Sequence, residues 1–293
     1  MPPPVLADFP LANLDETAVT DLAEFVQVHP RLFVLTGAGC STASGIPDYR
    51  DAVGQWKRRQ PVQHQEFIAS DAVRKRYWGR SLLGWPTLGN AQPNGAHRAL
   101  AALEARGHVS RLLTQNVDGL HQKAGSQQVQ ELHGSIAEVI CLSCHRITAR
   151  RTLQARLAEA NGWLLAEAAA RAGTAPDGDA DFETDFSAVA VPACENCGGV
   201  LKPHVVFFGD TVPKPLVDGA MAALEKADAL LVAGSSLMVY SGYRFCLKAA
   251  EWGKPIAAVN LGKTRADDLL TLKLEQACDQ ALPALAARVC SPV

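Results

Sequence analysis

The sequence carries little net charge and has no long apolar stretch. Its formal net charge is −2 over 293 residues, which gives no reason to expect nucleic acid or an anionic membrane as the main partner. No apolar run approaches the roughly 20 residues that a membrane-spanning helix needs. Residues 1–19 are proline-rich and acidic, unlike a secretory signal or a transit peptide. We therefore expect a cytoplasmic protein with no membrane or nucleic-acid partner.

The sequence also lacks internal repeats and low-complexity tracts, and 48% of its residues are apolar, enough for a sizeable core. Short apolar runs recur along the chain, and helical stretches at Ala96–Arg106 and Pro215–Ala227 separate several of them. The runs are Leu32–Leu35, Arg111–Thr114, His204–Phe208, Ala229–Ala233 and Pro255–Val259. This alternation predicts an α/β fold with a doubly wound, Rossmann-like parallel sheet. In such sheets, ligands bind at the carboxyl ends of the strands.

Two stretches break the alternation of strands and helices. Residues 51–95 are richer in charge and aromatics, and residues 138–203 contain two C-x-x-C pairs and a loop expected at Gly173–Asp179. We therefore predict a nucleotide-binding domain made of residues 1–50, 96–137 and 204–293. The helical insertion 51–95 and the zinc-binding insertion 138–203 are expected to form a second, smaller domain together.

Four of the eight cysteines form the two C-x-x-C pairs, Cys141 with Cys144 and Cys194 with Cys197. Without a secretory signal, such pairs favour metal binding over disulfides. Four thiolates complete a tetrahedral zinc site and leave no open position for water, so the predicted metal is structural. Two unrelated redox pairs are the alternative.

Gly37, Ala38 and Gly39 follow the first apolar run directly. Glycines there let backbone N–H groups approach a phosphate, and the helix expected to follow adds a favourable dipole. The usual dinucleotide fingerprint is absent, because it requires glycine where Thr42 stands. This failure disfavours an ordinary Rossmann dehydrogenase. A tight strand–helix turn explains the two glycines equally well.

A larger set of motifs resembles the sirtuin family. In order along Leu32–Cys278, they are Gly37–Arg50, Gln115–Asp118, His133–Gly134, the two C-x-x-C pairs, Gly234–Leu237 and Val259–Asn260. Segments Asp48–Trp85 and Gly234–Phe245 resemble the class II branch that includes the mitochondrial animal sirtuins, and the Ala/Arg-rich composition suggests a bacterial relative.

The resemblance implies an NAD-dependent protein lysine deacylase that carries NAD and Zn²⁺. In that reaction the acyl oxygen of an N6-acyl-lysine attacks the nicotinamide ribose, nicotinamide leaves, and the acyl group passes through an imidate to ADP-ribose. The implied catalytic residues are His133, as the base, with Asn116 and Asp118. A mono-ADP-ribosyltransferase using the same NAD site remains an alternative. A nucleic-acid-binding module built on the basic residues Lys57–Arg59 and Arg74–Arg76 is disfavoured by the balanced charge.

The resemblance also implies a cofactor site drawn from the ends of several strands. Its members are Gly37, Ala38, Gly39, Ser41, Ala43, Ile46, Asp48, Tyr49, Arg50, Gln115, Asn116, Asp118, Gly234, Ser235, Ser236, Asn260, Leu261, Gly262 and Cys278. Asp118 and the Ile46 backbone are expected to hold the nicotinamide carboxamide, and Asp48 is expected to orient Arg50. We expect Ser235 and Ser236 at a helix start, where they contact phosphate or simply cap the helix.

For the substrate, the resemblance implies an extended acyl-lysine peptide added as a strand along Val206, Phe207, Phe208 and Gly209. Tyr77 and Arg80 stand three apart on an expected helix, so they share one face. Some class II relatives use such a pair to read the carboxylate of succinyl- or malonyl-lysine. An exposed tyrosine and arginine without that role is the plainer interpretation. The sequence leaves the preferred acyl group, the protein substrates and the oligomeric state open.

Overall fold

The computed structural model describes residues 14–57, 60–172 and 184–290. The chain divides into two compact units: the first contains Met1–Arg59, Ala91–Leu132 and Val212–Val293, and the second contains Gln60–Asn90 and His133–Thr211. The loop expected at Gly173–Asp179 and the basic residues Arg58 and Arg59 lie outside the described residues. Across those described ranges, no helix is both long and apolar enough to cross a membrane.

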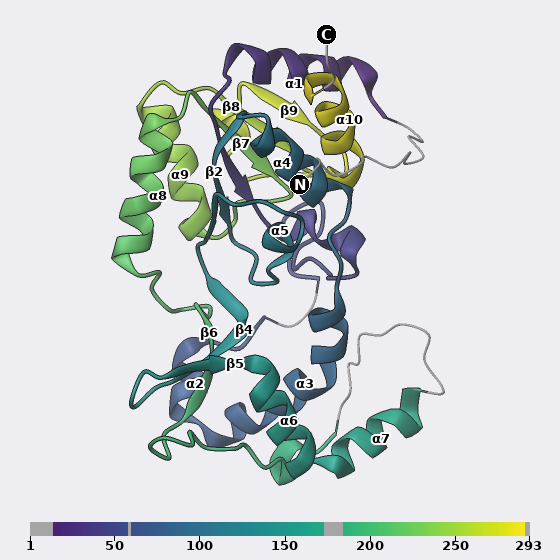
Figure 1. Cartoon of the computed structure of the whole chain (residues 1–293), viewed down its shortest axis with the longest axis vertical. Helices are drawn as coiled ribbons and strands as arrows, with labels where there is room; N and C mark the ends of the chain where they lie inside the picture. Colours follow the sequence, from purple (N-terminus) through teal and green to yellow (C-terminus); the bar gives the residue numbers. More distant parts are fainter. Residues whose placement is uncertain (1–13, 58–59, 173–183, 291–293) are drawn as a thin grey trace. The chain divides into compact units, whose positions relative to one another are not determined.

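The first unit is built on a six-stranded sheet in which every neighbouring pair is parallel, in the order β3-β2-β1-β7-β8-β9 (Figure 1). The strands are β1 (Leu32–Thr36), β2 (Val109–Thr114), β3 (Val129–Glu131), β7 (Ala229–Ala233), β8 (Ile256–Val259) and β9 (Leu272–Leu274). Every residue of the central strands β1, β7 and β8 is buried, as expected for a parallel sheet covered on both faces. The Rossmann-like sheet predicted from the sequence is confirmed.

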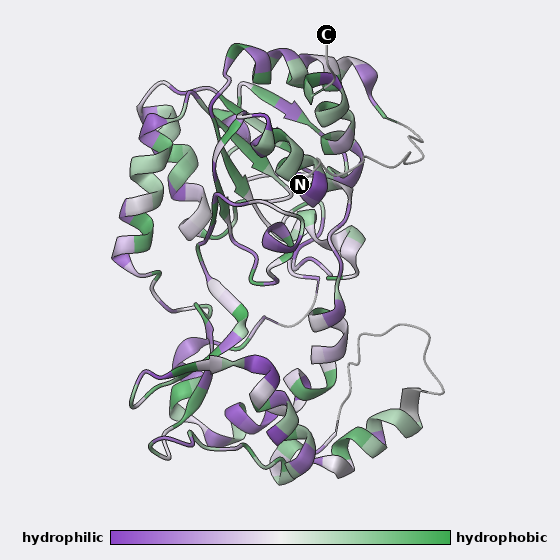
Figure 2. Ribbon diagram, in the orientation of Figure 1, coloured by the Kyte–Doolittle hydropathy of each residue, from purple (hydrophilic) through white to green (hydrophobic). Residues whose placement is uncertain are grey.

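Helices cover both faces of this sheet. On one face, Leu32 and Val34 of β1 pack in a core with α1 (Glu16–Val28), α4 (Gly95–Ala105) and α10 (Cys278–Cys290). On the other, Phe33 stacks on Phe245 of α9 (Tyr240–Glu251), next to α8 (Lys214–Lys226). This alternation follows from the two-residue period of a strand. Figure 2 shows the middle of this sheet mostly in green, the hydrophobic end of the scale. The short helix α5 (Leu120–Lys123) follows β2.

The second unit carries a three-stranded antiparallel sheet in the order β5-β4-β6. Its strands are β4 (Gly134–Cys141), β5 (Ile147–Ala149) and β6 (Leu201–Val205), and its helices are α2 (His64–Ala69), α3 (Asp71–Asn90), α6 (Arg150–Ala160) and α7 (Gly162–Ala172). A separate core of this unit centres on Phe67, Trp78, Leu153 and Leu157. The indole Nε1 of Trp78 donates to the Leu201 carbonyl at 3.2 Å, so the buried ring is satisfied.

One predicted strand is wrong in its assignment. The run His204–Phe208 was expected in the parallel sheet, but its first two residues end β6, which pairs antiparallel with β4, and the rest leaves the strand. A short apolar run shows that a segment is buried without showing which sheet buries it. Residues 133–137 and 204–211, expected in the nucleotide-binding domain, group with the second unit, where β4 and β6 pair. Residues 51–57 and 91–95, expected in the smaller domain, group with the first unit.

Candidate functional site

The loops after β1 and β7 touch through their backbones. Gly39 N donates to Gly234 O at 2.8 Å, and Gly37 N donates to Ala233 O at 3.1 Å. A Cβ on Gly37 would lie 2.8 Å from Gly234 O, and one on Gly234 would lie 2.3 Å from Cys40 N. Gly234 also has φ +62°, a left-handed conformation that favours glycine. The glycines therefore form a cradle in which only hydrogen fits, and this places the loop N–H groups at the sheet's carboxyl edge.

The chain after Gly39 does not enter an α-helix, contrary to the prediction. It forms two short 3₁₀ turns, Ala38–Cys40 and Thr42–Ser44, which end at Gly45 with φ +81°. Ser235 and Ser236 likewise lie in a loop rather than at a helix start, because α9 begins only at Tyr240. The expected helix dipoles are therefore missing at both places, and an anion there relies on loop N–H groups and hydroxyls.

Three predicted site residues meet beside the cradle. Asn116 Nδ2 donates to Gly37 O at 2.9 Å and to Ser41 Oγ at 3.1 Å. Ser41 Oγ in turn donates to Asp118 Oδ2 at 2.7 Å, and the other carboxylate oxygen of Asp118 accepts from Leu120 N at 2.9 Å. The loops after β1 and β2 are thus joined by one polar network that fixes the Asp118 carboxylate.

Gln115 connects this network to the loop after β7. Its Nε2 donates to Ser235 Oγ at 2.8 Å and to Thr36 O at 3.3 Å. A Cβ on Gly242 would lie 2.6 Å from Gln115 Oε1, so the glycine at the start of α9 makes room for this side chain. Gln115 therefore holds the β1, β2 and β7 ends in one arrangement.

Two buried histidines near Ser41, His97 and His121, were not predicted as site residues from the sequence. His97 Nδ1 lies 3.1 Å from Asn94 Oδ1, and His97 Nε2 lies 3.5 Å from Ser41 Oγ. The His121 ring packs 4.7 Å from the His97 ring, and its Nε2 lies 2.9 Å from Thr36 Oγ1. The only sequence signal was Asn94, the N-cap of α4, followed by His97 at the third helical position.

Burial governs the charge of these imidazoles. It lowers the pKa of His97 to about 4, although the nearby Asp118 carboxylate acts in the opposite direction. Burial, with a contribution from His97, also lowers the pKa of His121 well below its ordinary value. Both rings are therefore neutral at pH 7 and add no positive charge beside Ser41 and Thr36.

The loop that follows Gly45 is arranged differently from the prediction. Asp48 Oδ1 pairs with Lys57 Nζ at 2.5 Å and does not orient Arg50. Arg50 donates to Gly54 O at 2.7 Å and stacks 4.0 Å over the Trp56 ring, because an aromatic face also stabilises a guanidinium. The expected Asp48–Arg50 pair is therefore wrong.

The loop after β8 packs against this segment. A Cβ on Gly262 would lie 2.3 Å from Ala52 O, and Lys263 N donates to the same carbonyl at 2.7 Å. Asn260 is buried at the end of β8, where its Nδ2 donates to Leu261 O at 3.0 Å. The structure thus gathers the predicted residues at the ends of β1, β2, β7 and β8 at one edge of the sheet.

The remaining predicted cofactor contacts are placed as follows. Ile46 N donates to Ser41 O at 3.3 Å, and Ser236 O accepts from Arg265 N at 2.8 Å. Cys278 is buried at the start of α10, where its thiol lies 3.5 Å from Val259 O. Ala43 and Tyr49 are exposed.

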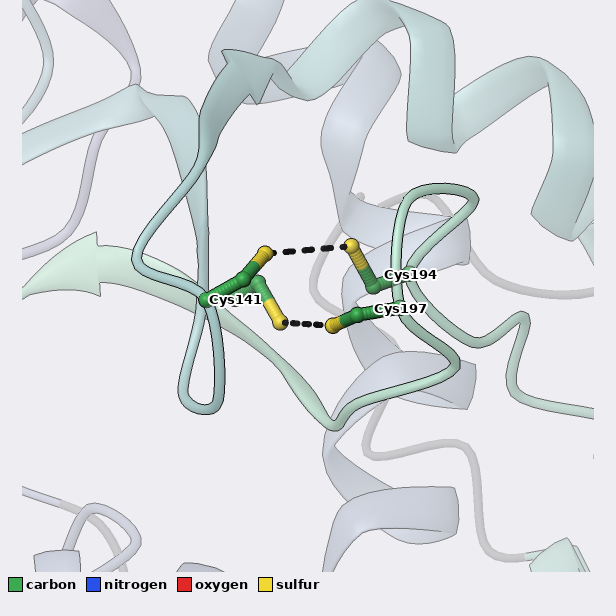
Figure 3. Close-up of side chains that lie close together, drawn as sticks. Cys141, Cys194 and Cys197 are labelled. Atoms are coloured by element: carbon green, nitrogen blue, oxygen red, sulfur yellow. Dashed lines mark hydrogen bonds between the residues drawn. The ribbon is translucent and has the colours of Figure 1, made fainter.

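In the second unit, the four predicted zinc ligands are together. Their sulfurs lie within 4.8 Å of one another, with Cys141 Sγ 3.5 Å from Cys197 Sγ and Cys144 Sγ 3.8 Å from Cys194 Sγ (Figure 3). Zinc–sulfur bonds of about 2.3 Å in a tetrahedron require sulfurs about 3.8 Å apart. The donor set therefore fits Zn²⁺, with all four positions taken by protein.

Backbone N–H groups lower the pKa of Cys141 and Cys144. The Gly199 N–H acts in the same direction on Cys197, but the neighbouring thiols of Cys144 and Cys141 raise its pKa. The Arg146 N–H, as the largest influence, lowers the pKa of Cys144 to about 6. The two turns hold their shape through His145 N donating to Cys141 O at 2.9 Å and Gly198 N donating to Cys194 O at 2.8 Å. His145 and Gly198 both have positive φ, as knuckle turns require.

His133 and the predicted substrate segment also meet in this unit. His133 is half-buried, and its carbonyl accepts from Val206 N at 2.8 Å. Gly134 has φ +78°, and a Cβ there would lie 2.2 Å from His204 O, so only glycine permits this close approach. The Phe208 carbonyl accepts a hydrogen bond from His64 N at 2.8 Å, and Phe208 forms an isolated parallel β-bridge with Gln63. Gly209 has φ +78° and turns the chain away.

Tyr77 and Arg80 both lie on α3, but their surroundings differ. The Tyr77 ring packs edge-on against Phe67 at 5.5 Å and against Phe207 at 5.3 Å. Arg80 is exposed. Phe207 is thus part of an aromatic cluster with Tyr77 and Phe67, whereas Arg80 lies at the surface of this unit.

A Rossmann-like sheet with a glycine cradle, accompanied by a four-cysteine module, defines a zinc-bearing nucleotide-binding class of protein. The Sir2 family model matches residues 37–241, and the chain belongs to the Sir2 family.

Similar relatives include NAD-dependent protein deacetylase 2 of Bradyrhizobium diazoefficiens, 57% identical over 279 residues, which are 94% of this chain and 98% of that protein. The mitochondrial NAD-dependent protein lipoamidase sirtuin-4 of Bos taurus is 50% identical over 95% of this chain and 89% of its own. A solved structure of Sir2 with a p53 peptide and NAD⁺ superposes with a TM-score of 0.72 at 29% identity, covering 90% of this chain and 95% of that one.

Proposed function

We propose that this protein is an NAD-dependent protein lysine deacylase that transfers the acyl group of an N6-acyl-lysine to ADP-ribose and releases nicotinamide. The observation that carries the proposal is the joining of the glycine cradle to the Ser41–Asn116–Asp118 network, in a chain whose relatives are named NAD-dependent protein deacetylases. NAD is the co-substrate in this proposal. Its ribose would accept the acyl group, nicotinamide would be the leaving group, and one water would be consumed as the lysine amine is freed.

The residues of the first unit would bind and orient NAD. The N–H groups of the cradle, with Ser235 and Ser236, suit the pyrophosphate, because loop N–H groups are good donors to anionic oxygens. The Asp118 carboxyl group is held in place by Ser41 Oγ and Leu120 N, so its oxygens can accept from an amide such as the nicotinamide carboxamide. Asn260, buried at the end of β8, suits the adenine ribose.

His133 is the proposed base for a ribose hydroxyl. An imidazole nitrogen can accept a proton from a hydroxyl within hydrogen-bond reach, which is the chemistry that this step needs. Gly134 supports the assignment, because its lack of a side chain leaves the Val205–Val206 backbone close to His133. Zn²⁺ in the four-cysteine site would hold the small sheet together without touching the reaction.

The acyl-lysine would lie along Val206–Gly209, with Phe207 and Tyr77 lining an aromatic wall. The relative named lipoamidase favours a long acyl chain as a second candidate besides acetyl. The exposed position of Arg80 gives an acidic acyl group less support than the sequence alone did. We also propose a cytoplasmic location and acyl-lysine proteins as partners. The names of the relatives do not favour the ADP-ribosyltransferase alternative.

A peptide panel tests the proposal. Acetyl-, lipoyl-, octanoyl- and succinyl-lysine peptides are incubated with NAD, and nicotinamide and O-acyl-ADP-ribose are quantified. We expect both products with acetyl or long-chain peptides. ADP-ribosylated protein without O-acyl-ADP-ribose would instead identify a transferase. If Arg80→Met lowers acetyl and succinyl turnover equally, the Tyr77–Arg80 pair does not read a carboxylate.

A further inference from the structure

Lys202 is a buried lysine that the proposed reaction does not explain. It lies within β6, paired across from Ile140 of β4, and is 5% exposed. Lysine is almost never buried unless its charge is paired. Yet its ammonium donates to backbone carbonyls and forms no ion pair with a carboxylate of the described residues. Burial lowers its pKa, although the charge of Asp210 acts in the opposite direction. The cost of burying this cation calls for a compensating role.

The partners of the ammonium come from one short stretch of chain. Lys202 Nζ donates to Pro203 O at 3.3 Å and to Val205 O, and it lies 4.6 Å from the centre of the Phe207 ring. Carbonyl dipoles and an aromatic face together stabilise a cation. The ammonium of Lys202 therefore contacts Pro203, Val205 and Phe207 at once, where β6 ends and the chain leaves the sheet.

The same stretch leads into the proposed acyl-lysine segment. Val206 N is bonded to His133 O, and Phe207 O accepts from Asp210 N at 3.0 Å. Val205 O accepts a hydrogen bond from Lys202 Nζ, so the carbonyls of both Val205 and Phe207, on either side of Val206, already have donors. In the part of the chain that the structure describes, the Val206 carbonyl accepts no hydrogen bond. It is the backbone acceptor that an added peptide strand requires.

We propose that Lys202 is a positioning residue for the acyl-lysine peptide. Its ammonium draws the Val205 carbonyl inward and fixes the Phe207 ring, so that the Val206 carbonyl and the Phe207 face are presented in one conformation. Lys202 itself does not touch the substrate. The inference rests on the proposed function only in taking Val206–Gly209 as the peptide-binding segment.

The experiment compares Lys202→Met, which keeps the apolar stem and removes the charge, with Lys202→Arg, which keeps a charged donor. Lys75→Met is the matched control, because Lys75 also donates to a backbone carbonyl of the second unit, Ser187 O at 3.1 Å, away from the segment. We expect Lys202→Met to raise the KM for an acetyl-lysine peptide about tenfold or more, the effect of losing a charged hydrogen-bond donor. The KM for NAD, zinc content and kcat should stay within about twofold.

The outcomes that support the role of Lys202 differ from those that overturn it. We expect Lys202→Arg to restore most of the peptide KM and Lys75→Met to match wild type. A wild-type peptide KM in Lys202→Met would overturn the inference, as would equal losses for peptide and NAD. If Lys202→Met does not bind one zinc per chain, Lys202→Gln is measured in its place. If the wild-type protein lacks deacylase turnover, the proposed function fails by itself, and anisotropy of a labelled acetyl-lysine peptide then tests Lys202 through binding alone.

Discussion

Substitution of Gly234 by alanine tests the glycine cradle, because the structure separates two costs at this position. The first is conformational: φ is +62°, and a left-handed non-glycine residue costs about 1 kcal/mol. The second is steric: the new Cβ would lie 2.3 Å from Cys40 N and 2.6 Å from Gly39 C, both backbone atoms that cannot rotate away. Overpacking of this kind costs about 1–3 kcal/mol. We expect Gly234→Ala to lower the free energy of unfolding by about 2–4 kcal/mol.

Gly253→Ala is the matched control. Gly253 has φ +66°, almost the same conformation, but nothing lies within 4 Å of its added Cβ. This variant should therefore show only the conformational cost of about 1 kcal/mol. Denaturant unfolding of both variants measures the difference, and calorimetry with NAD measures binding. We expect Gly234→Ala to weaken NAD binding and Gly253→Ala to leave it unchanged. Equal unfolding free energies in the two variants would refute the argument that the two loops touch through their backbones.

Three further predictions concern other parts of the molecule. His133→Ala should abolish deacylation while NAD affinity and zinc content stay at wild-type levels, and near wild-type turnover would remove the base assignment. Chelation of zinc should expose the amides of β4 and β6 to hydrogen exchange while β1 and β7 stay protected; unchanged exchange throughout would show that the metal is not structural. Because the pKa of folded His97 is about 4 and the unfolded value is 6.5, the unfolded state binds more protons between these values, so stability should fall as pH drops from 6.5 to 4, by about 3 kcal/mol for this group. His97→Gln should reduce that dependence and leave the part that His121 contributes, and an unchanged slope would contradict the assignment.

The sequence predicted the parallel sheet and the zinc ligands well, because both rest on local patterns. Apolar runs mark β1, β7 and β8, and the C-x-x-C spacing fixes two ligands on one turn. It failed where long-range contacts decide. Nothing in the run His204–Phe208 distinguishes the parallel sheet from pairing with β4. Helix starts were expected after Gly39 and at Ser235. The loops after β1 and β7 contact each other closely at these positions, and neither continues directly into an α-helix.

The side-chain pairing in the site was still harder to foresee. Asp48 and Arg50 stand close in sequence but do not pair. Because the chain folds back, Asp48 forms an ion pair with Lys57, and Arg50 stacks on the Trp56 ring. His97 and His121 became visible only when α4 and α5 placed them beside Ser41 and Thr36. Such buried polar partners have no sequence pattern of their own, since they depend on the packing of helices against the sheet.

The central claim is that cleavage of NAD and deacylation of lysine are one reaction at one site. The direct test counts products from the wild-type protein with an acyl-lysine peptide that it accepts. We expect one nicotinamide and one O-acyl-ADP-ribose for each lysine freed, and no deacylation when NAD is omitted. Lysine freed without NAD, or nicotinamide released with no lysine freed, would contradict the claim.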